Sequence, residues 1–348
     1  MLMRGGTSKG AFFLADDLPS TDSERDSLLL RVMGSPDPRQ IDGVGGAHPL
    51  TTKVAVVAPS DRDDIDLEYL FLQMSVDRPE VTDKQNCGNM LAAVGPFAVE
   101  RGLISPDDGR ASVRILMKNT GRVAVAGFPV EDGTPVYAGD TEIAGVPGAA
   151  AEVSIEFEDI AGSSTGALLP TGKVLDTVDG VEVTLIDNGM PVVVLSAADI
   201  GVTGYESCEE LEADDRLRQK LEEIRIVAGS MMNLGDVTRT TVPKLTLVSF
   251  PMADGVISTR TFIPHRCHQA IGVLGAVSVA TACLLPGSVA AKTSRLDPGS
   301  DRVRIEHPTG SFDATVRVEA GPEPTIVGAG IIRTARKLMD GVVFPRSY

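Results

Sequence analysis

The chain has 348 residues, 43% of them hydrophobic, which is enough for two domains with separate cores. Its formal net charge of −16 disfavours binding to nucleic acid and to anionic membrane surfaces, because both repel an acidic protein. The four cysteines form no CxxC pair and indicate free thiols in a reducing compartment. The most apolar stretch, residues 267–291, contains Gly, Ser, Thr and Pro throughout and predicts a buried helix, not a membrane span. The first ten residues lack the apolar core of a secretory signal, so we expect a cytoplasmic protein.

Residues 1–14 predict two strands joined by the glycine-rich turn RGGTSKG, residues 4–10. Backbone N–H groups and the hydroxyls of Thr7 and Ser8 make this turn a candidate anion-binding nest. The residue order of a phosphate-binding P-loop is absent, and a hairpin turn without any ligand is an equal alternative. A helix is predicted next, at residues 22–34.

Lys53 is the first candidate for acid–base chemistry. It follows a second glycine-dense loop, residues 41–46, and opens the apolar strand 54–57. An ammonium group that loses its water has a lowered pKa, which turns lysine into a base near neutral pH. The alternative is a solvated lysine at a strand edge, which is the more common case.

Cys87 is the second candidate. The stretch 85–103 reads as a polar loop that becomes an apolar helix, with Asn86 as its cap and Cys87 at its start. A helix start offers unpaired N–H groups and partial positive charge, which stabilise a thiolate and bind carboxylates. The alternative is that Cys87 is a small buried hydrophobic residue, as most free cysteines are.

The second half of the chain repeats the first. A hairpin at residues 111–128 matches one that begins at residue 303, and strand 245–250 leads to a second apolar helix as strand 69–76 leads to the first. We therefore predict an α+β duplication of two lobes, residues 1–150 and 151–348, with the last strand a candidate to return to the first lobe. Each lobe is expected to wrap a curved, mostly antiparallel sheet around a central helix, at residues 87–103 and 269–284, with the active site in a cleft between the lobes.

A basic segment precedes the second helix. It contains His265, Arg266 and His268. Positive charge at a helix start disfavours the helix, and an anionic ligand would explain why basic residues are present there. A chance basic surface loop is the alternative, and a zinc site lacks a fourth ligand. Cys267 is left open as a second thiol, because alignment of the two helices places Gly272 at the position of Cys87. Cys208 and Cys283 are expected to be structural, and residues 206–223 to form an acidic, solvated helix.

Long motifs across nearly the whole chain resemble the PrpF-like isomerases, a family with the duplicated diaminopimelate epimerase-like fold. They are MRGGTSKG, QIDGVGG, LTTKVAVV, QNCGNMLAAVGPFA, LLPTG, IDNGMPVV and PHRCHQAIG. The resemblance implies proton transfer on a tricarboxylate without cofactor or metal, with Lys53 and Cys87 as the acid–base pair. It implies substrate contacts from Thr7, Ser8, Asn86, Gly88, Asn89, His265, Arg266 and His268.

The function expected from this resemblance is enol–keto tautomerisation of an oxo-tricarboxylate in aromatic-acid breakdown. One alternative is allylic isomerisation of aconitate or methylitaconate, and another is a non-catalytic protein that binds such acids. Racemisation with two thiols is disfavoured, because the chain departs from the epimerase pattern at the second helix. The expected partner is the small-molecule substrate, with no nucleic acid and no membrane, and a homodimer is the candidate oligomer.

Overall fold

The computed structural model describes residues 1–84, 86–297, 299–319 and 325–347, and it divides into two compact units. Unit 1 comprises Met1–Glu158 and Ile332–Tyr348, and unit 2 comprises Asp159–Ile331. Gln85, the first residue of the predicted Cys87 stretch, lies outside the described residues. Among the described residues, no helix is both long and apolar enough to span a bilayer.

The unit boundary differs from the predicted one at residue 150. Strand β9 (Glu152–Phe157) pairs antiparallel with β7 (Arg122–Glu131), with Phe157 opposite Ala124. The Gly- and Pro-rich segment before it contains only β8 (Thr134–Pro135) and an isolated bridge between Thr141 and Ala150. This segment has the composition of a linker between domains, but it returns the chain to the same sheet, so the first unit ends after β9.

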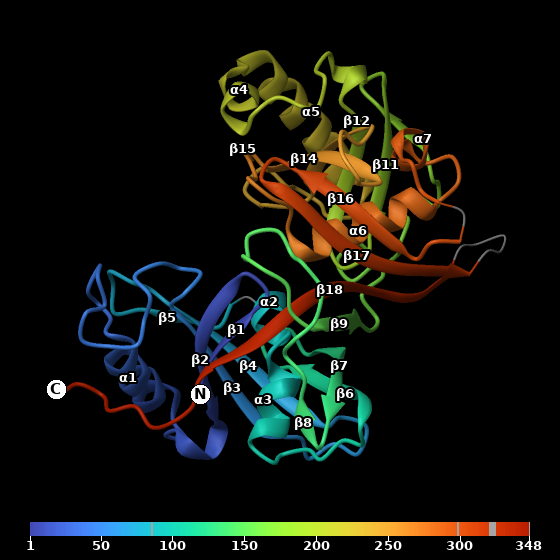
Figure 1. Cartoon of the computed structure of the whole chain (residues 1–348). Helices are drawn as coiled ribbons and strands as arrows, with labels where there is room; N and C mark the ends of the chain where they lie inside the picture. The colour runs from blue at the N-terminus through green and yellow to red at the C-terminus, as the bar shows by residue number, and fades with distance from the viewer. Residues whose placement is uncertain (85, 298, 320–324, 348) are drawn as a thin grey trace. The chain divides into compact units, whose positions relative to one another are not determined.

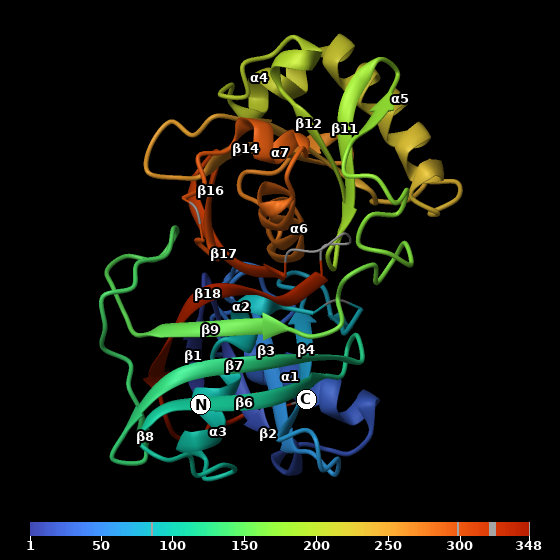
Figure 2. The same cartoon turned by 90° about the vertical axis from the view of Figure 1, so that its right-hand side faces the viewer.

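The sheet of unit 1 closes on itself. From β1 the pairings run to β2, β3, β4, β6, β7 and β9, and β9 and β1 both pair with β18. The β2–β3 and β4–β6 pairs are parallel and the other pairs with known register are antiparallel, so this is a mixed barrel (Figures 1 and 2). Its strands not yet bounded are β1 (Leu2–Gly5), β2 (Ser8–Leu14), β3 (Lys53–Pro59), β4 (Leu67–Met74), β5 (Val81–Thr82), β6 (Gly109–Met117) and β18 (Thr325–Met339).

The two-residue period of the strands separates two cores. Phe12 of β2 points inward, where its ring centroid lies 5.6 Å from that of Phe97. Its neighbour Ala11 points outward and belongs to a cluster with Leu29 and Met33 of α1 (Asp22–Met33). Ser8 and Gly10 share the inward face with Phe12, and this alternation decides which side chains meet the central helices.

The predicted central helix 87–103 is two short helices. Helix α2 covers Gly88–Leu91 and α3 covers Val94–Glu100. Pro96 has no N–H to donate to residue 92 and its ring crowds that carbonyl, so a continuous helix is interrupted there. Asn86 does not cap the helix, because Cys87 is the N-cap residue and the side-chain Oδ1 of Asn86 accepts from the Cys87 N–H at 2.8 Å.

Unit 2 has the same order of pairings as unit 1. The antiparallel pair β11–β12 is followed by a parallel β12–β13 pair, an antiparallel β13–β14 pair, a parallel β14–β16 pair and the β16–β17 hairpin. The central helix α6 (Val273–Leu284) begins four residues later than predicted, after the N-cap residue Gly272, and packs against β11, β12, β16 and β17 (Figure 2). The strands are β10 (Asp176–Val178), β11 (Val181–Asp187), β12 (Pro191–Ser196), β13 (Lys244–Ser249), β14 (Ile257–Ile263), β15 (Arg266–Cys267), β16 (Arg302–His307) and β17 (Gly310–Glu319).

The predicted acidic helix 206–223 is also divided. It forms α4 (Cys208–Ala213) and the start of α5 (Asp215–Met231), each with a capping side chain, from Ser207 and Asp214 respectively. The apolar side of α5 is not solvated, since Leu217, Leu221 and Ile224 join a core cluster with β11, β12 and β13. Helix α7 (Val289–Thr293) completes the unit.

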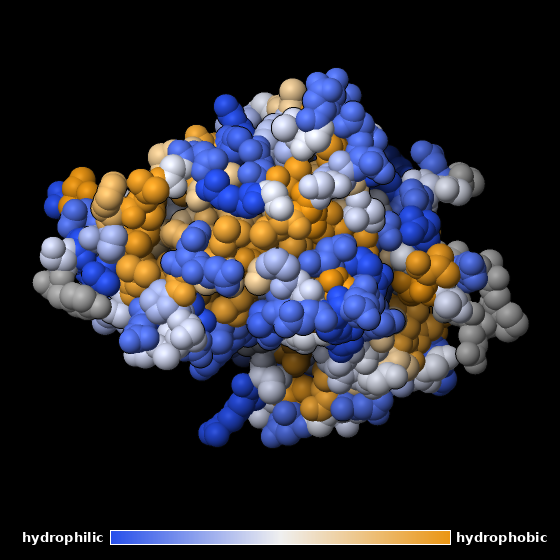
Figure 3. Space-filling model, turned by 90° about the horizontal axis from the view of Figure 1, so that it is seen from below, coloured by the Kyte–Doolittle hydropathy of each residue, from blue (hydrophilic) through white to orange (hydrophobic). Residues whose placement is uncertain are grey.

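Hydrophobic side chains also reach the surface. The face seen in Figure 3 carries several apolar patches between polar residues. On the C-terminal segment after β18, Val342 and Phe344 are 80% and 84% exposed.

Candidate functional site

Lys53 is buried at the start of β3. Parallel pairing with β2 sets it opposite Gly10, and antiparallel pairing with β4 sets it opposite Gln73. Its Nζ donates to Gln73 Oε1 at 2.6 Å and lies 5.0 Å from the centroid of the Phe71 ring. The residue is only 7% exposed, so the alternative of a solvated strand-edge lysine is wrong.

Burial lowers the pKa of Lys53, because the charged ammonium loses water that the side chain of Gln73 only partly replaces. The charge of Cys87 acts in the opposite direction and raises this pKa. Cys87 is thus close enough to affect the charge state of Lys53. Such an amine is a better base near neutral pH than an exposed lysine.

Cys87 is half-buried, and its sulfur lies 4.0 Å from Ser8 Oγ. Ser8 is 1% exposed and lies on the same inward face of β2 as Gly10, which is opposite Lys53. Tyr69 donates its hydroxyl to the Cys87 carbonyl at 3.4 Å, and burial raises the pKa of Tyr69 well above its usual value. Cys87 is the N-cap residue of α2, as predicted, but this helix is only one turn long, so the stabilisation of a Cys87 thiolate by the helix stays a prediction.

The glycine-rich turn packs against the segment after Cys87. A Cβ on Gly5 would lie 3.2 Å from the Asn89 carbonyl carbon and closer still to its oxygen. Gly6 has a φ of +49°, and a Cβ there would lie 2.8 Å from Asn89 Cγ. Asn89 Nδ2 donates to Thr7 Oγ1 at 3.1 Å. The glycines therefore let Asn89 position Thr7, in a turn that a side chain would push away.

The other predicted contacts from this segment have internal roles. The Asn86 amide donates to the sulfur of Met117, and its oxygen accepts from the Cys87 N–H. Gly88 is the first residue of α2. The structure thus brings Thr7, Ser8, Lys53, Cys87 and Asn89 together in unit 1, with Asn86 held beside them.

Two arginines at this turn were missed by sequence reasoning. Arg333 Nε donates to Asn89 Oδ1 at 3.0 Å, and Arg333 is 6% exposed. Arg4 Nη1 donates to the Gly6 carbonyl at 3.0 Å and to Thr334 Oγ1 at 2.9 Å, and burial lowers the pKa of Arg4. Arg333 lies 244 positions from Asn89, and only the pairing of β18 with β1 brings it to the turn. No local motif signals that contact.

The predicted contacts of the second half lie in unit 2, where carboxylates contact Arg266 and His265. Arg266 Nε lies 2.7 Å from Glu212 Oε2, and the Cys267 N–H donates to Glu212 Oε1 at 2.9 Å. His268 Nδ1 accepts from the Ala270 N–H at 2.8 Å, and burial lowers the pKa of His268. Glu212 of α4 is therefore a partner within the protein for the positive charge of Arg266. An anionic ligand at Arg266 would have to compete with this carboxylate.

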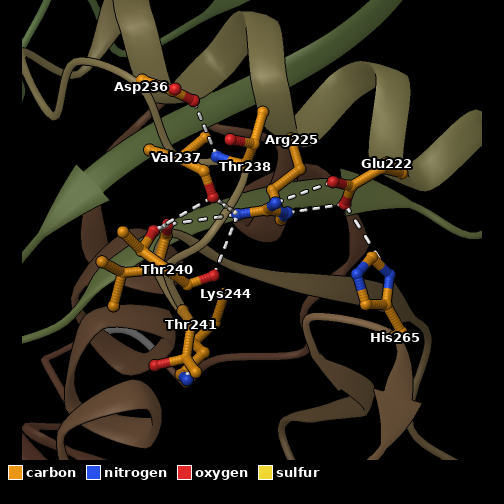
Figure 4. Close-up of polar contacts among 10 residues, drawn as sticks. Glu222, Arg225, Asp236, Val237, Thr238, Thr240, Thr241, Lys244 and His265 are labelled. Atoms are coloured by element: carbon orange, nitrogen blue, oxygen red, sulfur yellow. Dashed lines mark hydrogen bonds and ion pairs between the residues drawn. The ribbon is translucent and has the colours of Figure 1, made fainter.

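His265 meets a second carboxylate, and Figure 4 shows how this one is held. Glu222 Oε2 lies 3.8 Å from His265 Nδ1 and 2.7 Å from Arg225 Nε. Arg225 is fully buried, and its Nη1 donates to the Val237 carbonyl at 2.9 Å. The guanidinium lowers the pKa of Glu222, so this carboxylate remains charged beside His265.

Within the residues that the structure describes, no three His, Cys, Asp or Glu side chains are grouped to hold a metal. What unit 1 offers is a desolvated amine, a half-exposed thiol and hydroxyl and amide groups near them. That set can give and take protons and can bind an oxyanion.

Comparison with known proteins connects this chemistry to a family. A model described as PrpF protein matches residues 1–346. The chain is 58% identical to a 4-oxalomesaconate tautomerase of Pseudomonas putida, over 99% of this chain and 94% of that protein. It is also 58% identical to a (4E)-oxalomesaconate Delta-isomerase of Novosphingobium sp., over 99% and 96% of the two chains.

Solved structures agree in fold. The chain is similar to methylitaconate-delta-isomerase, with a TM-score of 0.90 and 33% identity over 98% of this chain and 93% of that one. It shares its fold with a probable proline racemase from Agrobacterium radiobacter, with a TM-score of 0.50 and 14% identity over 97% and 91% of the chains. The predicted isomerase function is thereby confirmed, and of the predicted epimerase-like fold the coarser class is confirmed, a mixed sheet that forms a barrel as in the racemase. The chain belongs to the PrpF family of isomerases.

Proposed function

We propose that this isomerase interconverts the enol and keto forms of 4-oxalomesaconate, a step of gallate breakdown, without a cofactor. The observation that carries the proposal is the buried Lys53 amine, whose pKa is lowered by burial and which senses the charge of Cys87. The name of the Pseudomonas putida relative supports the substrate.

In the proposed reaction, one proton leaves the enol oxygen and another is added to the neighbouring carbon. Lys53 and Cys87 give and take these protons, and a dienolate forms between the two steps. The hydroxyls of Thr7 and Ser8 and the amide of Asn89 bind the oxyanion and a carboxylate, with the positive charge of Arg333 behind Asn89. Further substrate contacts are proposed for Asn86, Gly88, His265, Arg266 and His268.

A second candidate is a 1,3-allylic shift, in which the proton moves from one carbon to another. The Novosphingobium relative, which is equally similar, is named a Delta-isomerase, and the structural relative is named for methylitaconate. The same amine and thiol serve either reaction, because both pass through a dienolate stabilised by the same groups.

Isotopic labelling separates the two candidates. The purified protein is incubated with substrate in deuterium oxide, and the position of the incorporated deuterium is located by NMR. Tautomerisation of the enol places deuterium on the carbon next to the oxo group, whereas an allylic shift places it on the far carbon of the former double bond. Deuterium at that far carbon would replace the tautomerase proposal with the Delta-isomerase.

Substitutions test the catalytic pair. We expect Lys53→Ala and Cys87→Ala each to lower kcat by about 10²–10⁴-fold, the usual contribution of a positioned acid or base, with folding unchanged by circular dichroism. Near-normal turnover of either variant would remove that residue from the mechanism. Binding of tricarboxylate by the native protein without any proton exchange would instead support a non-catalytic binding protein.

Two further proposals need only the native protein. Activity should survive dialysis against a chelator, since no metal or cofactor takes part in the proposed reaction. A homodimer should be seen by sedimentation, and a monomer at assay concentration would refute that expectation.

A further inference from the structure

Cys208 and Cys267 form a pair of thiols in unit 2. Cys208 is the first residue of α4, and Cys267 is the last residue of β15. Their sulfur atoms lie 3.0 Å apart, although the residues are 59 positions apart in the chain. A disulfide bond is about 2.05 Å long, so the two sulfurs are about 1 Å from bonding distance.

The backbone on both sides of the pair is held in place. Ser207 and Glu210 form a capping box at the start of α4, which fixes the helix turn that carries Cys208. Cys267 pairs with Phe262 of β14, and its N–H donates to Glu212 at the other end of α4. The two thiols thus lie where the start of α4 meets β15, and hydrogen bonds hold the backbone of both elements. A bond between the thiols therefore requires no large backbone movement.

We propose that Cys208 and Cys267 are a redox-active dithiol that a peroxide converts to an intramolecular disulfide and that a thiol reductant restores. In the first step one sulfur, as the thiolate, attacks a peroxide oxygen, and the O–O bond breaks to give a sulfenic acid and one water. In the second step the other sulfur attacks the sulfenic sulfur and expels a second water. The two thiol hydrogens end in water, the peroxide is reduced, and the two cysteines are oxidised by two electrons.

Burial makes this dithiol slow to react. Cys208 and Cys267 are 2% and 6% exposed, and burial raises the pKa of Cys267, so little thiolate is present at neutral pH. Cys283 in α6 is an internal comparison, since burial raises its pKa to about 12 and it forms no hydrogen bond to another thiol among the described residues. Cys87 is half-buried and will be oxidised sooner. Cys267 lies between Arg266 and His268, which are proposed substrate contacts, but the bond to Cys208 involves neither the Lys53 amine nor the Cys87 thiol. The inference therefore does not depend on the proposed function.

Peptide mapping tests the proposal on the full chain. The native protein is treated with hydrogen peroxide, alkylated while unfolded, and digested with trypsin. Cleavage after Lys173, Arg216, Arg266 and Lys292 places Cys208 in peptide 174–216 and Cys267 in peptide 267–292. We expect these peptides to appear linked, with the loss of two hydrogens, and to separate after treatment with dithiothreitol.

Single variants identify the bond, because peptide 267–292 also contains Cys283. Cys283→Ser should keep the link, whereas Cys208→Ser and Cys267→Ser should each lose it. Folding is checked by circular dichroism, and either of the last two variants carries the test if the other misfolds. Recovery of both cysteines as alkylated thiols after Cys87 is fully oxidised would overturn the proposal, as would a link to Cys283 or between chains.

Thermal unfolding gives an independent measurement. A bond between residues 208 and 267 restricts the unfolded chain, so the oxidised protein should melt several degrees higher than the reduced protein. Cys208→Ser should show no rise in Tm after peroxide treatment. An equal rise in that variant would assign the effect to another residue and contradict the proposal.

Discussion

Replacement of Gly6 by alanine tests whether the close approach of the glycine-rich turn to Asn89 matters. The φ of Gly6 is +49°, a conformation that costs an L-residue about 1–2 kcal/mol. The added Cβ would lie 2.8 Å from Asn89 Cγ and 3.1 Å from Arg333 Cδ, so the Asn89 side chain must move. Two hydrogen bonds then weaken, from Arg333 to Asn89 and from Asn89 to Thr7.

The expected magnitude follows from these contacts. A hydrogen bond to a charged group is worth about 1.5–3 kcal/mol and a neutral one about 0.5–1.5 kcal/mol. Together with the backbone strain, Gly6→Ala should destabilise unit 1 by about 3–6.5 kcal/mol if both hydrogen bonds are lost. In molecules that remain folded, a displacement of Thr7 by about 1 Å should lower kcat/KM by roughly 100-fold.

Gly121→Ala is the matched control. Gly121 has a φ of +68° in the β6–β7 turn, and nothing lies within 4 Å of an added Cβ. It carries the backbone strain without the collision, so we expect a loss of about 1–2 kcal/mol and normal turnover. Stability is measured by chemical denaturation followed by circular dichroism, and turnover with 4-oxalomesaconate. If Gly6→Ala equals Gly121→Ala in both measurements, the packing of the turn on Asn89 has no functional importance.

Other predictions address charge at the same site and in unit 2. Burial lowers the pKa of Lys53 from the usual lysine value of 10.5. If Lys53 is the base, kcat/KM should therefore rise with pH and level off below pH 10.5. A rise that continues to pH 10.5 would contradict a desolvated base. Arg333→Lys, which loses the Nε contact to Asn89, should raise KM at least several-fold with little change in Tm, and an unchanged KM would refute the positioning of Asn89 by Arg333. Arg225→Met leaves the Glu222 carboxylate without its buried partner and should destabilise unit 2 by about 3–5 kcal/mol, measured by calorimetry; an unchanged Tm would show that this pair is dispensable.

Local sequence was sufficient where local chemistry decides the structure. The glycine-rich turn is the connection between β1 and β2, and the predicted helix 22–34 is α1. Both hairpins of the repeat are present, as β6–β7 and β16–β17. In each case turn residues or hydrophobic periodicity act over a few neighbouring positions, and tertiary contacts do not compete with them.

Tertiary structure decided what depends on distant partners. Pro96 and the surrounding barrel divide the central segment into α2 and α3, so the helix that begins after Cys87 is one turn long and not the continuous helix that was predicted. Arg266 and His265, which were predicted to bind an anionic ligand, contact carboxylates of α4 and α5. No local sequence pattern predicts these contacts, because the carboxylates lie tens of residues away in the chain from the basic residues that they contact.

Local sequence showed that the amine of Lys53 and the thiol of Cys87 come after the two glycine-rich loops of the first half, and it predicted that the halves repeat. Only the fold decided that Lys53 is desolvated, that Arg333 reaches Asn89, and that Cys208 meets Cys267. The physical reason is that burial and charge pairing are properties of strand register. Sequence periodicity shows which face of a strand is apolar, but the pairing of β18 with β1 and of β3 with β2 sets which side chains meet there.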